Sequence, residues 1–209
     1  MLDSKGFDKW AGEYDKSIAE SSKGFPFEGY YDVLSSVHSL VKEPKGKNIL
    51  DIGIGTGLLT NELYKKGANI FGLDFSERMI TEAKIKMPNG SFHISDMKDG
   101  IPEALNSKCF DYIVSSYTIH HLDKEEKLKF IKDLKDILAN EGSIIIADIS
   151  FMNNEDLAEC KLESEHKWDE EEHYMVIEDL TGDLLGMGFT SKYTQISKYA
   201  GVLELSKNN

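Results

Sequence analysis

Short apolar runs alternate with longer amphipathic segments along most of this chain. The run Ile49, Leu50 and Ile52 is typical of a strand buried on both faces. Similar runs predict further strands at 69–73, 91–94, 110–116 and 143–149, and two closing strands at 189–197 and 199–205. Apolar positions spaced by three and four predict helices between them, at 58–66, 77–86, 123–140 and 176–185. The alternation indicates one α/β domain.

The first 44 residues have a different pattern. Phe7, Trp10, Ala11, Tyr14 and Ile18 share one helical face, and 30–41 is a second amphipathic segment. Gly24 and Pro26 separate the two segments. We therefore predict an N-terminal helical cap over 1–44, hinged near 21–26 as a lid, and a ligand-binding domain over 45–209.

A glycine-rich turn follows the first strand, in the stretch N-I-L-D-I-G-I-G-T-G-L-L. Gly53, Gly55 and Gly57 allow a tight turn and a close approach of ligand to backbone. A helix start after them would add N–H donors, as a nucleotide-like ligand requires. The spacing is not the dinucleotide pattern G-x-G-x-x-G, because Leu58 stands where its third glycine falls. Asp51 disfavours a pyrophosphate and suits a ligand that carries an ammonium group.

D-I-G-I-G-T-G resembles the first motif of the class I S-adenosylmethionine (SAM)-dependent methyltransferases. Ile54, which follows the first glycine, departs from the usual residue there. The resemblance implies a Rossmann-like, seven-stranded, mostly parallel sheet with helices on both faces, and SAM as cofactor. It also implies that Asp51 and the three glycines bind that cofactor. The alternative for the motif alone is a glycine turn that binds nothing.

Two acidic residues at later strand ends extend the resemblance. Asp74 lies 21 positions after Gly53, where a carboxylate can accept both hydroxyls of an adenosine ribose. The resemblance implies that Asp96 accepts a hydrogen bond from the adenine amino group and that the Met97 backbone N–H meets a ring nitrogen of the adenine. Phe75 and Met97 could flank the adenine faces. The alternative roles are a helix cap for Asp74, an ordinary loop position for Asp96 and a core position for Met97.

The fourth-strand segment F-D-Y-I-V-S-S-Y-T-I-H-H-L is also similar to the family pattern. The resemblance implies that Tyr117 lies beneath the methionine part of the cofactor, with Thr118, His120 and His121 near the reaction centre. Histidine takes up a proton near neutral pH, so His120 is a candidate catalytic residue, with a structural role as the alternative. For His121 we expect packing and a bond to backbone.

The N-terminal stretch F-D-K-W-A-G-E-Y-D resembles the segment that lies over the cofactor in many small-molecule methyltransferases. The resemblance implies that Tyr14 faces the cofactor or the substrate, as a second candidate catalytic residue. The alternative is that Tyr14 packs its helix onto the domain.

Charge and composition limit the partners. The 37 acidic and 24 basic side chains give a net charge of -13, so nucleic acid is an unlikely partner. The sequence has neither an apolar signal core nor a membrane-length run, and Cys109 and Cys160 suggest reduced thiols, so we expect a cytoplasmic protein without membrane contact. A homodimer is compatible with these features.

A metal site is not expected, although His166, Glu170 and His173 have the spacing of one helical face. The surrounding acidic residues indicate a solvated helix instead.

Together the motifs predict a SAM-dependent methyltransferase that acts on a small molecule. The chain contains neither N-P-P-Y nor D-P-P-Y after the fourth strand and no Pro-Cys pair, which disfavours methylation of DNA bases. Three alternatives remain: an NAD-linked oxidoreductase, an aminopropyltransferase on a related fold, and a non-catalytic SAM-binding module.

Overall fold

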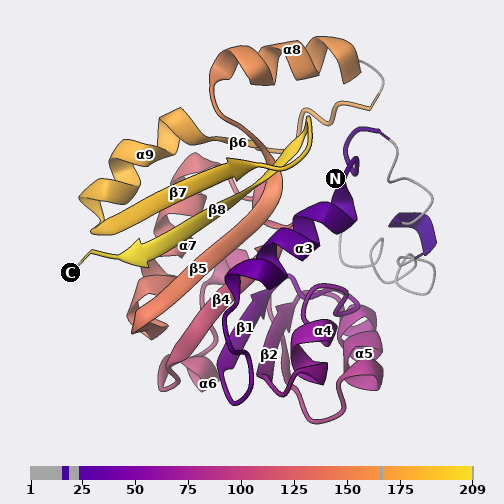
Figure 1. The fold of residues 1–209 in the computed structure, drawn as a ribbon, viewed down its shortest axis with the longest axis vertical. Helices are drawn as coiled ribbons and strands as arrows, with labels where there is room; N and C mark the ends of the chain where they lie inside the picture. The colour runs from indigo at the N-terminus through magenta and orange to yellow at the C-terminus, as the bar shows by residue number, and fades with distance from the viewer. Residues whose placement is uncertain (1–15, 19–23, 165–166, 209) are drawn as a thin grey trace.

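The fold is built on one mixed sheet, shown in Figure 1. The computed structural model describes residues 16–18, 24–164 and 167–208. The strand order is β3-β2-β1-β4-β5-β8-β7, and a short β6 pairs with β5 outside this path. The strands are β1 (Asn48–Ile52), β2 (Asn69–Asp74), β3 (Ser91–Ile94), β4 (Phe110–Ser116), β5 (Leu138–Phe151), β6 (Met175–Val176), β7 (Phe189–Gln195) and β8 (Ala200–Lys207).

Strand directions confirm the predicted mostly parallel sheet. The strands β3, β2, β1, β4 and β5 pair in parallel, whereas β8 is antiparallel to both β5 and β7. The chain runs outward from β1 in one direction through β2 and β3, and in the other through β4 and β5. Open α/β sheets bind ligands at such a reversal, beyond the carboxyl ends of the strands. The fold therefore places any cleft after β1, β2 and β4.

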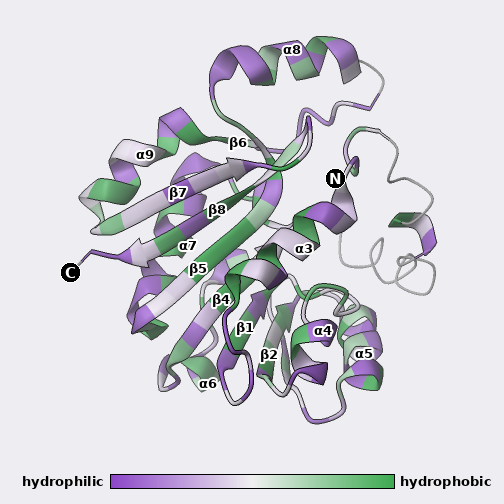
Figure 2. Cartoon of the chain, in the orientation of Figure 1, coloured by the Kyte–Doolittle hydropathy of each residue, from purple (hydrophilic) through white to green (hydrophobic). Residues whose placement is uncertain are grey.

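Helices cover both faces of the sheet. Side chains of α3, α4 and α5 join one buried cluster, and those of α6, α7 and α9 join a second. Figure 2 colours the chain by hydropathy and shows that β5, an inner strand of the sheet, is hydrophobic along much of its length. The helices are α3 (Tyr30–Leu40), α4 (Asn61–Lys65), α5 (Glu77–Lys86), α6 (Glu103–Asn106), α7 (Lys124–Ile137), α8 (Asn154–Ser164) and α9 (Ile177–Gly186), with 3-10 turns η1 (Met97–Asp99) and η2 (Ile119–His121).

The end of α7 differs from the sequence prediction. The helix begins with a capping box, in which the Asp123 and Glu126 side chains each bond to the other residue's backbone N–H. The helix ends at Ile137, however, and 138–142 belong to β5 rather than to a helix stop. Leu138 pairs with Phe110 of β4, and a Cβ on Gly142 would lie 2.9 Å from a β4 carbonyl oxygen. Pairing with β4 therefore overrides the local helical pattern.

The helix after the glycine turn begins later than predicted. The Gly57 N–H donates to the Ile54 carbonyl (2.8 Å), which closes a turn, and the Asn61 N–H then donates to the Gly57 carbonyl. The helix α4 therefore spans Asn61–Lys65 instead of starting at Leu58.

The N-terminal cap is described only in part. The predicted helix at 30–41 is present as α3, and Tyr30, Val33 and Val37 are buried in the core cluster against the sheet. Trp10, Tyr14 and half of the predicted hinge (21–23) lie outside the described residues, so the lid remains a prediction. None of the helices in the described part is long and apolar enough to cross a bilayer.

Gly53 and Gly55 allow a test of how tightly the turn is packed. Both have positive φ (67° and 53°), but a Cβ on Gly53 would lie 2.3 Å from the Thr118 side chain, whereas one on Gly55 meets nothing within 4 Å. We expect Gly55→Ala to lower the free energy of unfolding by about 1–2 kcal/mol through backbone strain alone. Gly53→Ala should lower the free energy of unfolding by roughly 1–3 kcal/mol more than Gly55→Ala does, because the Thr118 side chain is branched at Cβ and cannot rotate away from the added methyl group. Urea unfolding at 25 °C measures both; equal losses would contradict the close packing.

Candidate functional site

A cleft of about 970 Å³, its open mouth included, lies beyond the carboxyl ends of the central strands. The walls come from the glycine turn, from the ends of β2, β3 and β4 and from α3. The lining residues include Tyr30, Gly53, Ile54, Gly55, Asp74, Phe75, Asp96, Met97, Tyr117, Thr118 and His121.

Asp74 ties the glycine turn to the second strand. Its Oδ2 accepts from the Gly55 N–H at 2.8 Å, and its Oδ1 accepts from the Ser76 N–H at 2.9 Å. The side chain is 7% exposed and lines the cleft. Asp74 also supports the start of helix α5, which Ser76 caps by accepting from the Met79 N–H.

Asp51 lies beneath the turn rather than on the cleft wall. It is 1% exposed, and its Oδ2 accepts from the Thr60 hydroxyl at 2.7 Å. Within the described residues its Oδ1 has no hydrogen-bond partner. Burial raises the pKa of Asp51 to about 7, although the Thr60 bond opposes this shift. An orphaned buried carboxylate oxygen is poorly satisfied on its own and suits a nearby cation or N–H donor.

Of the three predicted glycines, two line the cleft. Gly53 and Gly55 are on the wall, whereas Gly57 is not among the lining residues. A Cβ on Gly57 would lie 2.5 Å from the Met87 terminal methyl, so this glycine serves packing against the segment after α5.

Phe75, Asp96 and Met97 lie together on the wall formed by the ends of β2 and β3. Asp96 is exposed and caps η1, accepting from the Lys98 N–H at 2.9 Å. The predicted adenine-side residues are thus brought to the same part of the cleft.

Tyr117 forms the wall at the end of β4 in a strained conformation. Its φ is 49°, in the left-handed region that bulky side chains rarely adopt. Its ring stacks on Tyr30 of α3 at a centroid distance of 4.8 Å. Tyr30, which the sequence suggested only as a helix position, therefore contributes to the cleft, and no local sequence signal distinguishes it.

The histidine pair on η2 differs from expectation. His121, expected to pack and bond to backbone, lines the cleft, whereas His120 is buried behind it with 6% of its surface exposed. The two rings meet edge to face at 4.3 Å. Burial, and then the neighbouring His120 charge, lowers the pKa of His121 to about 3, so this ring is neutral at physiological pH.

Asp148 of β5 fixes His120, and the sequence analysis missed it. Its Oδ1 meets the His120 Nδ1 at 2.6 Å, and its Oδ2 accepts from the Thr118 and His120 N–H groups. Burial alone would raise the pKa of Asp148, but the charge and hydrogen bond of His120 hold it below its usual range. Its position at the end of a central parallel strand, like Asp51 and Asp74, is a signal that could have identified it.

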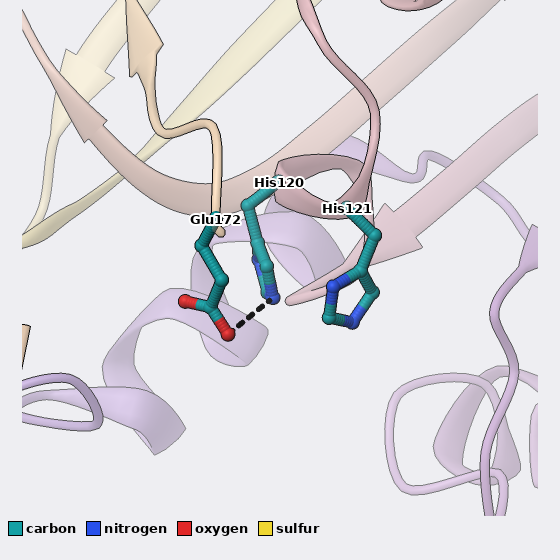
Figure 3. Close-up of side chains that lie close together, drawn as sticks. All are labelled: His120, His121 and Glu172. Atoms are coloured by element: carbon teal, nitrogen blue, oxygen red, sulfur yellow. Dashed lines mark ion pairs between the residues drawn. The ribbon is translucent and has the colours of Figure 1, made fainter. Parts of the chain in front are cut away.

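Glu172 reaches the same region from the segment before β6, as Figure 3 shows. Its Oε1 lies 3.8 Å from the His120 Nε2, and its Oε2 accepts from the Tyr174 hydroxyl at 2.7 Å. The acidic segment that contains it is not the predicted helix. Helix α8 ends at Ser164, and 167–174 are non-helical.

The helical face predicted for His166, Glu170 and His173 is therefore wrong. Glu170 instead pairs with Lys161 of α8 at 2.7 Å, and His166 lies outside the described residues. Tyr14 also lies outside them, so its role remains a prediction.

Comparison with known proteins identifies the family. The methyltransferase domain family matches residues 43–201. A protein of Alkaliphilus oremlandii, named an uncharacterized methyltransferase, is 33% identical over 96% of this chain and 95% of its own. A similarly named Geobacillus protein is 30% identical, with 96% of each chain covered. The chain belongs to the methyltransferase domain family and is a class I SAM-dependent methyltransferase.

Solved structures share the fold. A DhpI complex with S-adenosylhomocysteine (SAH) has a TM-score of 0.74 and 16% identity, covering 98% of this chain and 95% of the other. A magnesium protoporphyrin IX methyltransferase from Synechocystis, with bound SAH, has a TM-score of 0.72 and 18% identity, covering 99% and 100%. The cofactor of the family, SAM, suits the cleft described here, because its ammonium group complements the orphaned oxygen of Asp51.

The buried charge of Asp51 predicts a pH dependence of cofactor binding. An ammonium group favours the ionised carboxylate, so with a pKa of about 7 the affinity for SAH should rise as pH increases from 5.5 to 7.5. A rise on the order of tenfold follows from the change in ionised fraction. Asp51→Asn should bind roughly tenfold more weakly at pH 7.5 and lose the dependence. Calorimetry with SAH measures both.

Asp111→Asn is the matched control, since Asp111 also lies on a central strand but pairs with Lys47 at 2.8 Å, away from the cleft. In Asp111→Asn, the affinity for SAH should change with pH as it does in the wild type.

Because burial raises the folded-state pKa of Asp51, its contribution to stability is present below about pH 4 and lost as pH rises to about 7. Asp51→Asn should therefore not be less stable than wild type at pH 7.5. If the affinity of Asp51→Asn for SAH still rose with pH as in the wild type, Asp51 would be excluded as the cause of the pH dependence.

Proposed function

We propose that this enzyme transfers the methyl group of SAM to a small-molecule acceptor whose reacting atom lies at the histidine end of the cleft. The observation that carries the proposal is the order of groups along the wall. Asp74 ends β2 and Asp96 follows β3, on one side of β1, whereas His121 follows β4 on the other side, with the His120 ring packed against it. Bound SAM supplies an electrophilic methyl group, so the protein needs to position the acceptor and exclude water.

The residues take the roles predicted from the sequence. Asp74 would hold the ribose hydroxyls and Asp96 the adenine amino group, with Phe75 and Met97 on the adenine faces. Asp51 would attract the ammonium group from beneath the turn, and Tyr117 would support the methionine part. His120 would be the catalytic residue at the acceptor end, oriented by Asp148 through its 2.6 Å contact. Because it is buried behind the cleft wall, it would reach the acceptor only beside His121, whose ring it meets at 4.3 Å.

A small acceptor is supported by two independent features. The net charge of -13 opposes binding to a phosphate backbone. Among proteins of the same fold, one is named for magnesium protoporphyrin IX, a small molecule.

An NAD-linked function has less support. A dinucleotide site uses turn N–H groups for the pyrophosphate, but here the Gly55 N–H already donates to Asp74 and the Gly57 N–H to Ile54. The buried carboxylate of Asp51 beneath the turn would also repel a pyrophosphate.

His120→Ala tests the reaction centre. We expect the release of SAH, measured with labelled SAM and a panel of thiols, amines, phenols and carboxylic acids, to fall about 10²–10⁴-fold, the usual contribution of a positioned acid–base group. Binding of SAH should change little, since His120 is not on the cleft wall.

His93→Ala is the control, because His93 lies on the edge strand β3 and is not a lining residue. Full turnover in His120→Ala would exclude His120. Absence of turnover with every acceptor in wild type, alongside normal SAH binding, would instead favour a non-catalytic SAM-binding module.

A further inference from the structure

The ligand atoms of His120, His121 and Glu172 converge on one space, which Figure 3 shows. Each residue offers one nitrogen or carboxylate oxygen, and these atoms lie within 4.8 Å of one another. The histidines come from η2, and Glu172 comes from the non-helical segment before β6. Two imidazoles and one carboxylate form the ligand set of many catalytic zinc sites, which keep a further position open.

We propose that these three side chains bind a divalent transition metal ion of the zinc type. Tetrahedral bonds of 2.0–2.2 Å place zinc ligands roughly 3.3 Å apart, so the present spacing is slightly wide. The gap between the His120 Nε2 and the Glu172 Oε1 is 3.8 Å, too long for a hydrogen bond. A small shift of the Glu172 carboxylate, which lies on a loop, toward the His120 Nε2 would shorten this gap.

The surrounding hydrogen bonds orient these ligands as metal sites require. The His120 Nδ1 is bonded to Asp148 at 2.6 Å, which directs the opposite nitrogen, Nε2, toward Glu172. The Tyr174 hydroxyl donates to the Glu172 Oε2 and leaves Oε1 toward His120. Metal-binding histidines and carboxylates commonly have such outer partners.

Backbone bonds hold the two contributing segments together. The His173 N–H donates to the His120 carbonyl at 2.8 Å, so the Glu172 segment is attached directly to η2. The buried Lys127 amine donates to the Leu122 and His173 carbonyls and thus links the same two segments. The ligand set therefore does not depend on a chance approach of surface side chains.

The site borders the cleft, because His121 lines it. An open coordination position there would take an anionic oxygen or sulfur atom of the acceptor. This role rests on the proposed function, whereas metal binding itself does not.

Zinc binding by the full-length, chelator-treated chain tests the proposal. Cys109 is an exposed thiol that can bind zinc by itself, so all proteins carry Cys109→Ser. Competition of Zn²⁺ with a chromophoric chelator should give one site per chain. Glu172→Gln and His121→Asn should each weaken binding at least roughly tenfold, and Asp148→Asn, which removes an outer partner, about 10–100-fold.

Glu171→Gln and His93→Ala are matched controls: Glu171 is the exposed neighbour of Glu172, and His93 lies on β3. Both should bind zinc within about twofold of the parent, by the usual independence of separate sites. Absence of a site, or equal affinity in Glu172→Gln and His121→Asn, would overturn the proposal. Calorimetry with SAH on the same samples separates the two hypotheses. Normal SAH binding without zinc binding contradicts only the metal site, and zinc binding without SAH binding contradicts only the proposed function.

Discussion

The buried carboxylate of Asp148 is the constraint on which the histidine end of the cleft depends. A fully buried charge is costly unless donors surround it, and here the Thr118, His120 and Ile149 N–H groups and the His120 ring all contact it. Satisfying this one group fixes the path of the chain after β4. The position of η2, and hence of both histidines, follows from it.

Asp51, Asp74 and Asp148 lie at or near the carboxyl ends of three parallel strands, and the surroundings of the three carboxylates differ. Asp74 is bonded by backbone N–H groups and lines the cleft, Asp148 is saturated by the chain after β4, and Asp51 retains an orphaned oxygen among the described residues. An aspartate near the end of a parallel strand can therefore have three different roles here: Asp74 lines the cleft, Asp148 positions η2, and Asp51 is buried with an oxygen unpartnered within the described part of the chain. Burial raises the pKa of Asp51 to about 7, whereas the charge and hydrogen bond of His120 hold the pKa of Asp148 below its usual range.

The sequence allowed the sheet, and most of the cleft wall formed by the glycine turn and the ends of β2 and β3, to be predicted, because both depend on local patterns. Apolar runs identified the strands, and the spacing from Gly53 to Asp74 located two walls. The end of α7 was mispredicted, since Leu138 is held by a partner on β4 that local helical spacing does not encode. Tyr30 and Glu172 join the cleft and the histidine pair only through tertiary packing, which no pattern within their own segments reports.

This division has a physical origin. The lining residues of the glycine turn and of the ends of β2 and β3 lie close to a strand end, so a short motif fixes them relative to the sheet. The histidine end of the cleft combines η2, which Asp148 positions, with a segment far along the chain that reaches it through the His173–His120 backbone bond. Changes in the segment at 167–174 can therefore alter the surroundings of the histidines without disturbing the glycine turn or the strand ends. A common methyl-donor site can in this way serve different acceptors on one fold.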